Sequence, residues 1–121
     1  MQSKGLLGAW GESLAADFLR RRHYEIVACN YRSRFGEIDI IAKNRSFLVF
    51  AEVKLRKTDR FGQAREFVDA AKQNRLRDTA MLWLQTHETA LQPRFDVIEI
   101  YAPEGLETKK PQIRQIEDAF I

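Results

Sequence analysis

The chain has 121 residues, of which 45% are hydrophobic and 31% are charged. This length suits one domain, and the apolar fraction is large enough for a core that needs no disulfide or structural metal. The formal net charge is only +3, so charge alone does not identify a nucleic-acid-binding protein. The positions of the basic residues are more informative than the net charge.

The single cysteine, Cys29, excludes an internal disulfide and fits a reducing compartment. We expect Cys29 to be structural, because no base partner for a reactive thiol is evident. The N-terminal sequence has no continuous apolar segment of the signal-peptide kind, and no apolar run approaches the roughly 20 residues of a membrane span. We therefore expect one soluble, cytoplasmic domain over residues 1–121, with no membrane partner.

The apolar patterns predict, in chain order, a helix, three strands, a second helix and a fourth strand. The predicted ranges are 9–22 for the first helix, 24–31, 37–42 and 47–55 for three strands, 64–86 for the long helix and 94–100 for the fourth strand. The tail, 111–121, is expected to add a short edge strand. The apolar stripe of the first helix consists of Leu7, Gly11, Leu14, Ala15 and Phe18.

Connection lengths predict the topology. Short turns, including KNRS at 43–46, make the first three strands antiparallel neighbours, and the long helix forms a crossover to a parallel fourth strand. The third strand is apolar on both faces, so we expect it at the centre of the sheet, covered on both sides. The predicted fold class is α/β, a mixed central β-sheet flanked by helices in the order α-β-β-β-α-β.

One face of the third strand changes abruptly from apolar to charged. Residues two apart in a strand share a face, so Leu48 and Phe50 lie in line with Glu52, Lys54 and Arg56. Burial therefore ends, or a pocket begins, at the C-terminal end of this strand.

Asp39, on the preceding strand, shares this face in two of the registers that the turn allows. A hairpin symmetric about Asn44 and Arg45 places Asp39 diagonal to Glu52, about 7–8 Å away, and a shift of two places them directly opposite at about 5 Å. Either spacing lets both carboxylates reach one cation. An odd shift would put them on opposite faces.

Two carboxylates this close repel each other, and a divalent cation removes the conflict. Oxygen ligands suit Mg²⁺ or Mn²⁺. Lys54, on the same face, could orient an attacking water or stabilise charge on a phosphate. The competing interpretation is an exposed strand face on which Glu52 and Lys54 form an ordinary surface ion pair.

Two helical residues are further candidates. Glu12 lies at the edge of the apolar stripe, where Gly8 and Ala15 leave room for its carboxylate to reach the sheet; the alternative is an ordinary boundary glutamate. Lys72 shares a ridge with Leu76, so it either extends into solvent or reaches the site.

Asp39 and Glu52-Val53-Lys54 resemble the PD-(D/E)xK signature of restriction-endonuclease-like nucleases, and an acidic residue on the first helix, here Glu12, is similar to the Holliday-junction resolvase branch. The closer resemblance is to the YraN family of endonuclease-like proteins. It covers almost the whole chain and is carried, in order, by GAWGESLAADFL, NYRSRFGEIDIIA, FLVFAEVKLR, FGQAREFVDAAKQNRL and RFDVIEI.

The departures from these patterns leave the acidic residues and the lysine intact. Ile38 replaces the proline of the generic signature, Ala51 stands where valine is usual, and His23 stands where glycine is usual. The replacement of glycine by His23 affects the turn into the first strand.

The resemblance implies a restriction-endonuclease-like core and metal-assisted hydrolysis of phosphodiester bonds. Asp39 and Glu52 would then be ligands of Mg²⁺ or Mn²⁺, Lys54 the catalytic lysine, and Glu12 a further ligand of the metal or of a water. Junction resolvases act as symmetric dimers, so a homodimer stays open, although no stretch reads as a dimer interface.

DNA is the nucleic-acid partner that we expect, with RNA, single strands, duplexes and junctions all left open. The expected contacts with its phosphates are Arg32, Arg34, Arg56, Lys72 and Gln73. The alternatives are a nucleic-acid-binding module that does not cleave, on the same fold, and a scaffold that binds another protein.

Overall fold

The computed structural model describes residues 5–57 and 69–120. Its elements are α1 (Leu6–Arg21), β1 (Glu25–Arg32), β2 (Glu37–Lys43), β3 (Phe47–Arg56), α2 (Ala70–Thr86), β4 (Gln92–Tyr101), the 3-10 turn η2 (Gly105–Glu107) and β5 (Gln112–Ile116). This order confirms the predicted core and the expected edge strand. The start of the predicted long helix, 64–68, lies outside the described residues. No helix in the described part of the chain is long and apolar enough to cross a membrane.

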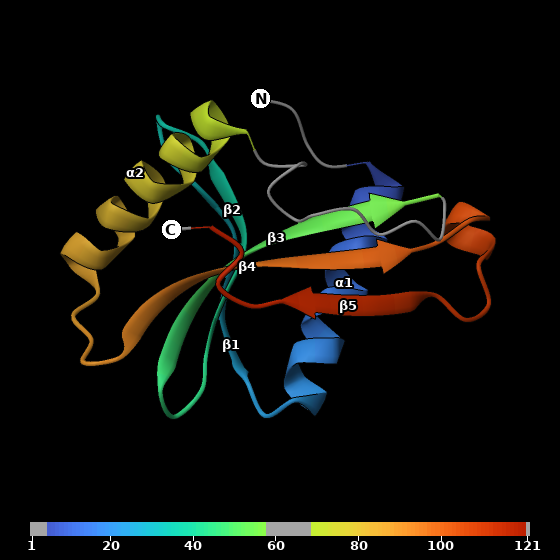
Figure 1. Cartoon of the computed structure of the whole chain (residues 1–121), viewed down its shortest axis with the longest axis horizontal. Helices are drawn as coiled ribbons and strands as arrows, with labels where there is room; N and C mark the ends of the chain where they lie inside the picture. Colours follow the sequence, from blue (N-terminus) through green and yellow to red (C-terminus); the bar gives the residue numbers. More distant parts are fainter. Residues whose placement is uncertain (1–4, 58–68, 121) are drawn as a thin grey trace.

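The strands form one mixed sheet in the order β1-β2-β3-β4-β5. β3 and β4 are parallel, as the crossover through α2 predicts, and the other neighbouring pairs are antiparallel. Figure 1 shows a strongly twisted sheet with α1 and α2 on different sides of it. The prediction that β3 is the central strand is confirmed.

The two faces of β3 belong to two separate cores. Val49 and Ala51 pack in a cluster that includes α1, whereas Leu48 and Phe50 pack in a cluster that includes α2. This alternation follows from the period of two in a strand. Glu52, the next residue on the α2-facing side of β3 after Phe50, therefore lies directly beside a buried core.

Helix α1 is rotated relative to its predicted stripe. Its buried residues are Gly11, Glu12, Ala15, Ala16 and Leu19, whereas Leu7 is 37% exposed. At Gly11 the helix packs closely on β3, because a Cβ atom there would lie 3.1 Å from the Leu55 side chain. The small residues of α1 consequently face β3, and Glu12 moves from the edge of the stripe onto the buried face.

The turn between β2 and β3 sets the register of the hairpin. The Asn44 side-chain oxygen accepts hydrogen bonds from the backbone N–H groups of Ser46 and Phe47, at 2.9 and 2.8 Å. Asparagine favours such local bonds in turns. Lys43 then pairs with Leu48. The pairing is therefore shifted by two from the symmetric hairpin, which is one of the two registers that keep Asp39 on the face of Glu52.

His23 lies in the connection between α1 and β1 and has a φ of 70°. This left-handed conformation suits glycine, because glycine has no Cβ to clash. His23 therefore occupies a backbone conformation that glycine adopts more readily than a residue with a side chain.

Candidate active site

Asp39 and Glu52 lie where β2 and β3 stop pairing. The last pair in register is Ile40 with Ala51, and Asp39 and Glu52 are the next residue of each strand. The Asp39 Oδ2 atom accepts a hydrogen bond from the Val53 backbone N–H at 2.8 Å, so this carboxylate links the two strands beyond their last pair. Both side chains are buried, and the two residues are 6% and 8% exposed. The interpretation of Glu52 as part of a fully exposed strand face does not hold.

Two lysines face the Glu52 carboxylate. Lys72 Nζ lies 2.6 Å from Glu52 Oε1, and Lys54 Nζ lies 3.7 Å from the same oxygen. Lys72 comes from the first turn of α2, where Asp69 caps the helix by accepting a hydrogen bond from the Lys72 backbone N–H at 2.8 Å. Of the two orientations left open for Lys72, the structure shows the one that reaches the site.

Burial and crowding shift the pKa values of these groups. Burial, and then the negative charge of Asp39, raise the pKa of Glu52 above its ordinary value. Burial, and then the positive charge of Lys72, lower the pKa of Lys54. Burial opposes the charged form of Lys72 as well, but its hydrogen bond to Glu52 and the charge of Glu52 outweigh this and raise the pKa of Lys72. Perturbed groups gathered in this way are typical of functional sites.

The two carboxylates fit the ligand set of one Mg²⁺ or Mn²⁺ ion. Such ions are commonly bound through one or two carboxylates, with water and phosphate oxygens completing the shell. The charge of Asp39 helps to raise the pKa of Glu52, and a divalent cation would relieve this repulsion. The ammonium group of Lys72 already neutralises Glu52, so a metal ion would have to compete with it for Oε1.

Glu12 is placed differently. It lies on the buried side of α1, which packs against the opposite face of the sheet from α2. Its charge, after burial, helps to raise the pKa of Cys29 on β1, which does not favour a reactive thiol there. Over residues 5–57 and 69–120, no three His, Cys, Asp or Glu side chains are grouped so as to hold a metal ion. The role of Glu12 as a third ligand stays a prediction.

The other predicted nucleic-acid contacts lie at several places around the sheet. Arg32 is the last residue of β1, and its Nε atom lies 3.7 Å from Glu37 Oε2. Arg34 is exposed in the loop that follows β1. Arg56 ends β3, two residues after Lys54, and Gln73 follows Lys72 on α2. Their contacts with nucleic acid stay predictions.

The sequence patterns do not single out the charged residues of β4. Asp96 is 0% exposed and binds Arg94 through both carboxylate oxygens, each at 2.9 Å. Glu99 is also 0% exposed and pairs in register with Lys54 of β3. The only sequence signal is the presence of charged residues in the otherwise apolar RFDVIEI, which a strand with one exposed face would also give.

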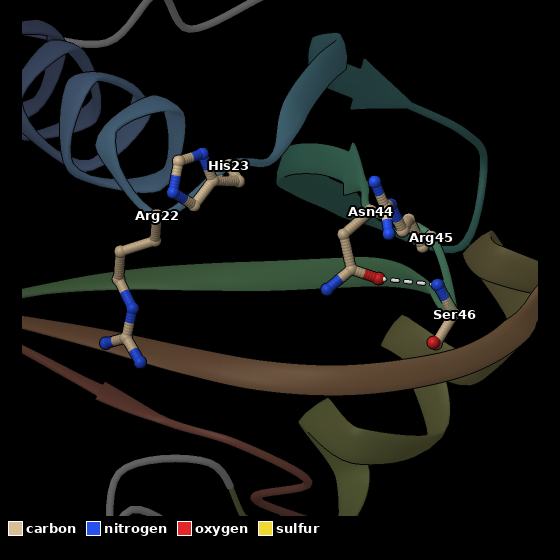
Figure 2. Close-up of a pocket in the computed structure, with 5 residues that line it drawn as sticks. All are labelled: Arg22, His23, Asn44, Arg45 and Ser46. Carbon is tan, nitrogen blue, oxygen red and sulfur yellow. Dashed lines mark hydrogen bonds between the residues drawn. The ribbon is translucent and has the colours of Figure 1, made fainter.

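A separate polar pocket lies at the opposite end of β2 and β3. Figure 2 shows its lining residues, which come from the end of α1 and from the β2–β3 turn: Arg22, His23, Asn44, Arg45 and Ser46. This lining offers hydrogen-bond donors but no carboxylate. Acidic ligands for a cation are therefore at the Asp39 end of the hairpin and not in this pocket.

The fold and the cluster at the end of its central strand define a mixed α/β domain with paired carboxylates and two lysines. Residues 11–100 match the family described as Uncharacterised protein family UPF0102. The chain is 44% identical over 115 residues to a UPF0102 protein of Renibacterium salmoninarum, covering 94% of this chain and 98% of that protein. It is 40% identical over 120 residues to a UPF0102 protein of Nitrosomonas europaea, covering 99% and 98%. The chain belongs to the UPF0102 family, which confirms the resemblance to the YraN family.

Proposed function

We propose that this protein is a metal-dependent nuclease that hydrolyses phosphodiester bonds of DNA, with branched or repair intermediates among its substrates. The observation that supports this most is the meeting of four side chains at one strand end: Asp39, Glu52, Lys54 and Lys72. Two buried carboxylates beside two ammonium groups are costly, and such an arrangement is typical of a site that handles charge.

Each side chain has a distinct role in this proposal. Asp39 and Glu52 would hold one Mg²⁺ or Mn²⁺ ion, which would supply a Lewis acid and lower the pKa of a bound water. Lys54 stabilises the negative charge that develops on the phosphate, and its lowered pKa brings it closer than an ordinary lysine to exchanging a proton. Lys72, whose ammonium group lies 2.6 Å from Glu52 Oε1, would also be close enough to this site to bind a phosphate oxygen.

A non-catalytic nucleic-acid-binding module on the same fold is the second candidate. The observation in its favour is the 2.6 Å contact between Lys72 Nζ and Glu52 Oε1, which neutralises this carboxylate without any metal. In that case the basic residues bind phosphate and the cluster serves to hold α2 on β3.

A cleavage assay separates the two candidates. Labelled single strand, duplex, flap and four-way junction DNA would each be incubated with the protein in Mn²⁺, Mg²⁺ or EDTA. We expect cleavage that requires a metal and is lost in Asp39→Asn, whose side-chain oxygen can still accept the Val53 hydrogen bond. The matched control is Asp17→Asn, at an exposed acidic residue of α1, which should cleave as the natural protein does.

Binding without any cleavage, unchanged in Asp39→Asn and in EDTA, would reject the nuclease and support the binding module. Cleavage that Asp39→Asn retains in full would reject the assignment of the site.

A further inference from the structure

Three charged side chains form a row across three neighbouring strands, next to the candidate site. Lys54 of β3 pairs in register with Glu99 of β4, and Glu99 pairs in register with Arg114 of β5. Val97 and Ile116 lie two residues from Glu99 and Arg114, and both pack in the core that includes α2. Because residues two apart share a face, the row lies on the same side of the sheet as Glu52.

Glu99 is an unusual member of this row. It is 0% exposed, and neither of its carboxylate oxygens has a hydrogen-bond partner among the described residues. Arg114 Nη2 lies 3.6 Å from Glu99 Oε1, and the Arg114 side chain is 49% exposed. A buried carboxylate without hydrogen bonds is destabilising in itself, so its presence beside a half-exposed guanidinium needs an explanation.

The spacing of the row matches a nucleic-acid backbone. Neighbouring strands are about 4.8 Å apart, so the backbones of β3 and β5 are separated by about 10 Å. One strand of a duplex advances about 3.4 Å per nucleotide along the helix axis. A phosphate within about three nucleotides of the one beside Lys54 is therefore within reach of Arg114. Guanidinium groups are well suited to bind phosphate oxygens in pairs.

We propose that Arg114 binds a backbone phosphate of the nucleic acid within about three nucleotides of the one that is cleaved, and that Glu99 positions Arg114 for this contact. This inference rests on the proposed function, because the site at Lys54 sets where the strand lies. It extends the nucleic-acid surface from the strand ends of β1 and β3 to the edge strand β5. Glu99 acts only through Arg114 and touches no substrate.

Binding of a fluorescent single strand and a fluorescent duplex in EDTA tests this without requiring cleavage. We expect Arg114→Ala to weaken binding about tenfold, equally for different sequences, and to reduce the slope of log affinity against log salt by about one. Arg114→Lys should recover part of the affinity. The matched control is Arg45→Ala, an exposed arginine in the pocket of Figure 2, which should change the affinity little.

The role of Glu99 is tested by a double-mutant cycle. Glu99→Gln should weaken binding when Arg114 is present and have no further effect in Arg114→Ala, because the two residues act as one unit. Additive losses would overturn the positioning role. Thermal unfolding of each variant establishes that it is folded.

Two further outcomes separate this inference from the proposed function. Specific loss of binding in Arg114→Ala, with no cleavage of any substrate, would reject the nuclease and keep the Arg114 contact. Equal losses in Arg114→Ala and Arg45→Ala, or no loss in either, would overturn the Arg114 contact even if the protein cleaves DNA.

Discussion

At the scale of single residues, Glu52 is held by competing interactions. Burial and Asp39 favour its neutral form, whereas Lys72 and Lys54 favour its carboxylate. Lys72 is the nearer ammonium, at 2.6 Å from Glu52 Oε1 against 3.7 Å for Lys54. A divalent cation at this carboxylate would meet the positive charge of Lys72 directly.

Replacing Lys72 by methionine should therefore strengthen metal binding. Loss of a unit positive charge beside the ion is worth about 1 kcal/mol even at a high effective dielectric constant, or about fivefold in affinity. Isothermal titration with Mn²⁺ at pH 8 would measure it, at a pH that favours ionised Glu52. Lys72→Arg keeps the charge and should show no gain. A weaker affinity in Lys72→Met would contradict the competition.

Glu99 predicts a pH dependence of stability. Burial raises its pKa above the ordinary glutamate value of 4.5, and Arg114 and Arg56 offset this only in part. The folded state then binds the proton more tightly than the unfolded state, so stability falls as pH rises through the raised pKa. Glutamine does not ionise. Glu99→Gln should thus be more stable than the natural protein at neutral pH, with the gain vanishing below pH 4.5.

Urea unfolding from pH 4 to pH 8 would measure this gain. Glu104→Gln, at an exposed glutamate, serves as the comparison and should change little across the range. A Glu99→Gln variant less stable than the natural protein at neutral pH would contradict this prediction. It would show that the Arg114 contact stabilises the ionised Glu99 by more than burial destabilises it. A variant that is stabilised yet binds nucleic acid more weakly would fit a residue kept for function.

At the scale of elements, β4 carries a buried ionic network that joins four strands or their flanks. Asp96 binds Arg94, accepts a hydrogen bond from Gln115 of β5 at 2.8 Å and is 0% exposed. Arg94 in turn donates to the hydroxyl of Tyr24 at 2.8 Å, just before β1, and its guanidinium lies 4.4 Å from the centre of the Phe47 ring of β3. The network lies on the α1 side of the sheet, away from the candidate site.

Asp96→Ala should destabilise the protein by about 3–5 kcal/mol, because it leaves the buried Arg94 guanidinium with only the longer 3.8 Å ion pair to Glu117. Chemical denaturation would measure the loss. The matched comparison is Asp17→Ala, which removes an exposed pair with Arg20 at 2.9 Å and should cost no more than about 1 kcal/mol. Similar losses in the two variants would show that the β4 network contributes no more than a surface pair.

The elements themselves were predictable from the sequence, whereas their register and rotation were not. Period-two and helical patterns are local, and they place α1, β1 to β4 and the end of α2 within a few residues. The register of β2 and β3 depends on hydrogen bonds made by the Asn44 side chain, and the burial of Glu12 depends on how α1 packs against β3, which it approaches closely at Gly11. Such contacts between distant or turn residues leave no periodic trace.

Some residues of the candidate site were likewise predictable from the sequence, and others were not. Asp39, Glu52 and Lys54 were predictable because strand periodicity and the resemblance place them on one face. The position of Lys72 depends on where Asp69 begins α2, and Glu99 is set beside Lys54 only by the parallel pairing of β3 with β4. Neither position follows from spacing within one element.

At the scale of the whole molecule, the two faces of the sheet differ in what they hold. Its α1 side holds a core and the Arg94–Asp96 network, and its α2 side holds a second core that ends in the charged cluster. The central strand β3 takes part in both, and Figure 1 shows α1 and α2 on different sides of the twisted sheet. This arrangement places the cluster where a rigid strand and the capped start of α2 meet, which is the kind of support that a precise site requires.

Whether Asp39 and Glu52 together hold one divalent cation can be measured directly. Calorimetric titration of the natural protein with Mn²⁺ tests it without knowledge of the substrate, beside Asp39→Asn, Glu52→Gln and the exposed control Asp17→Asn. We predict one ion per chain, bound at least about tenfold more weakly in each of the first two variants and unchanged in the third. Equal binding in all four proteins, or none in the natural protein, would contradict the proposed metal site.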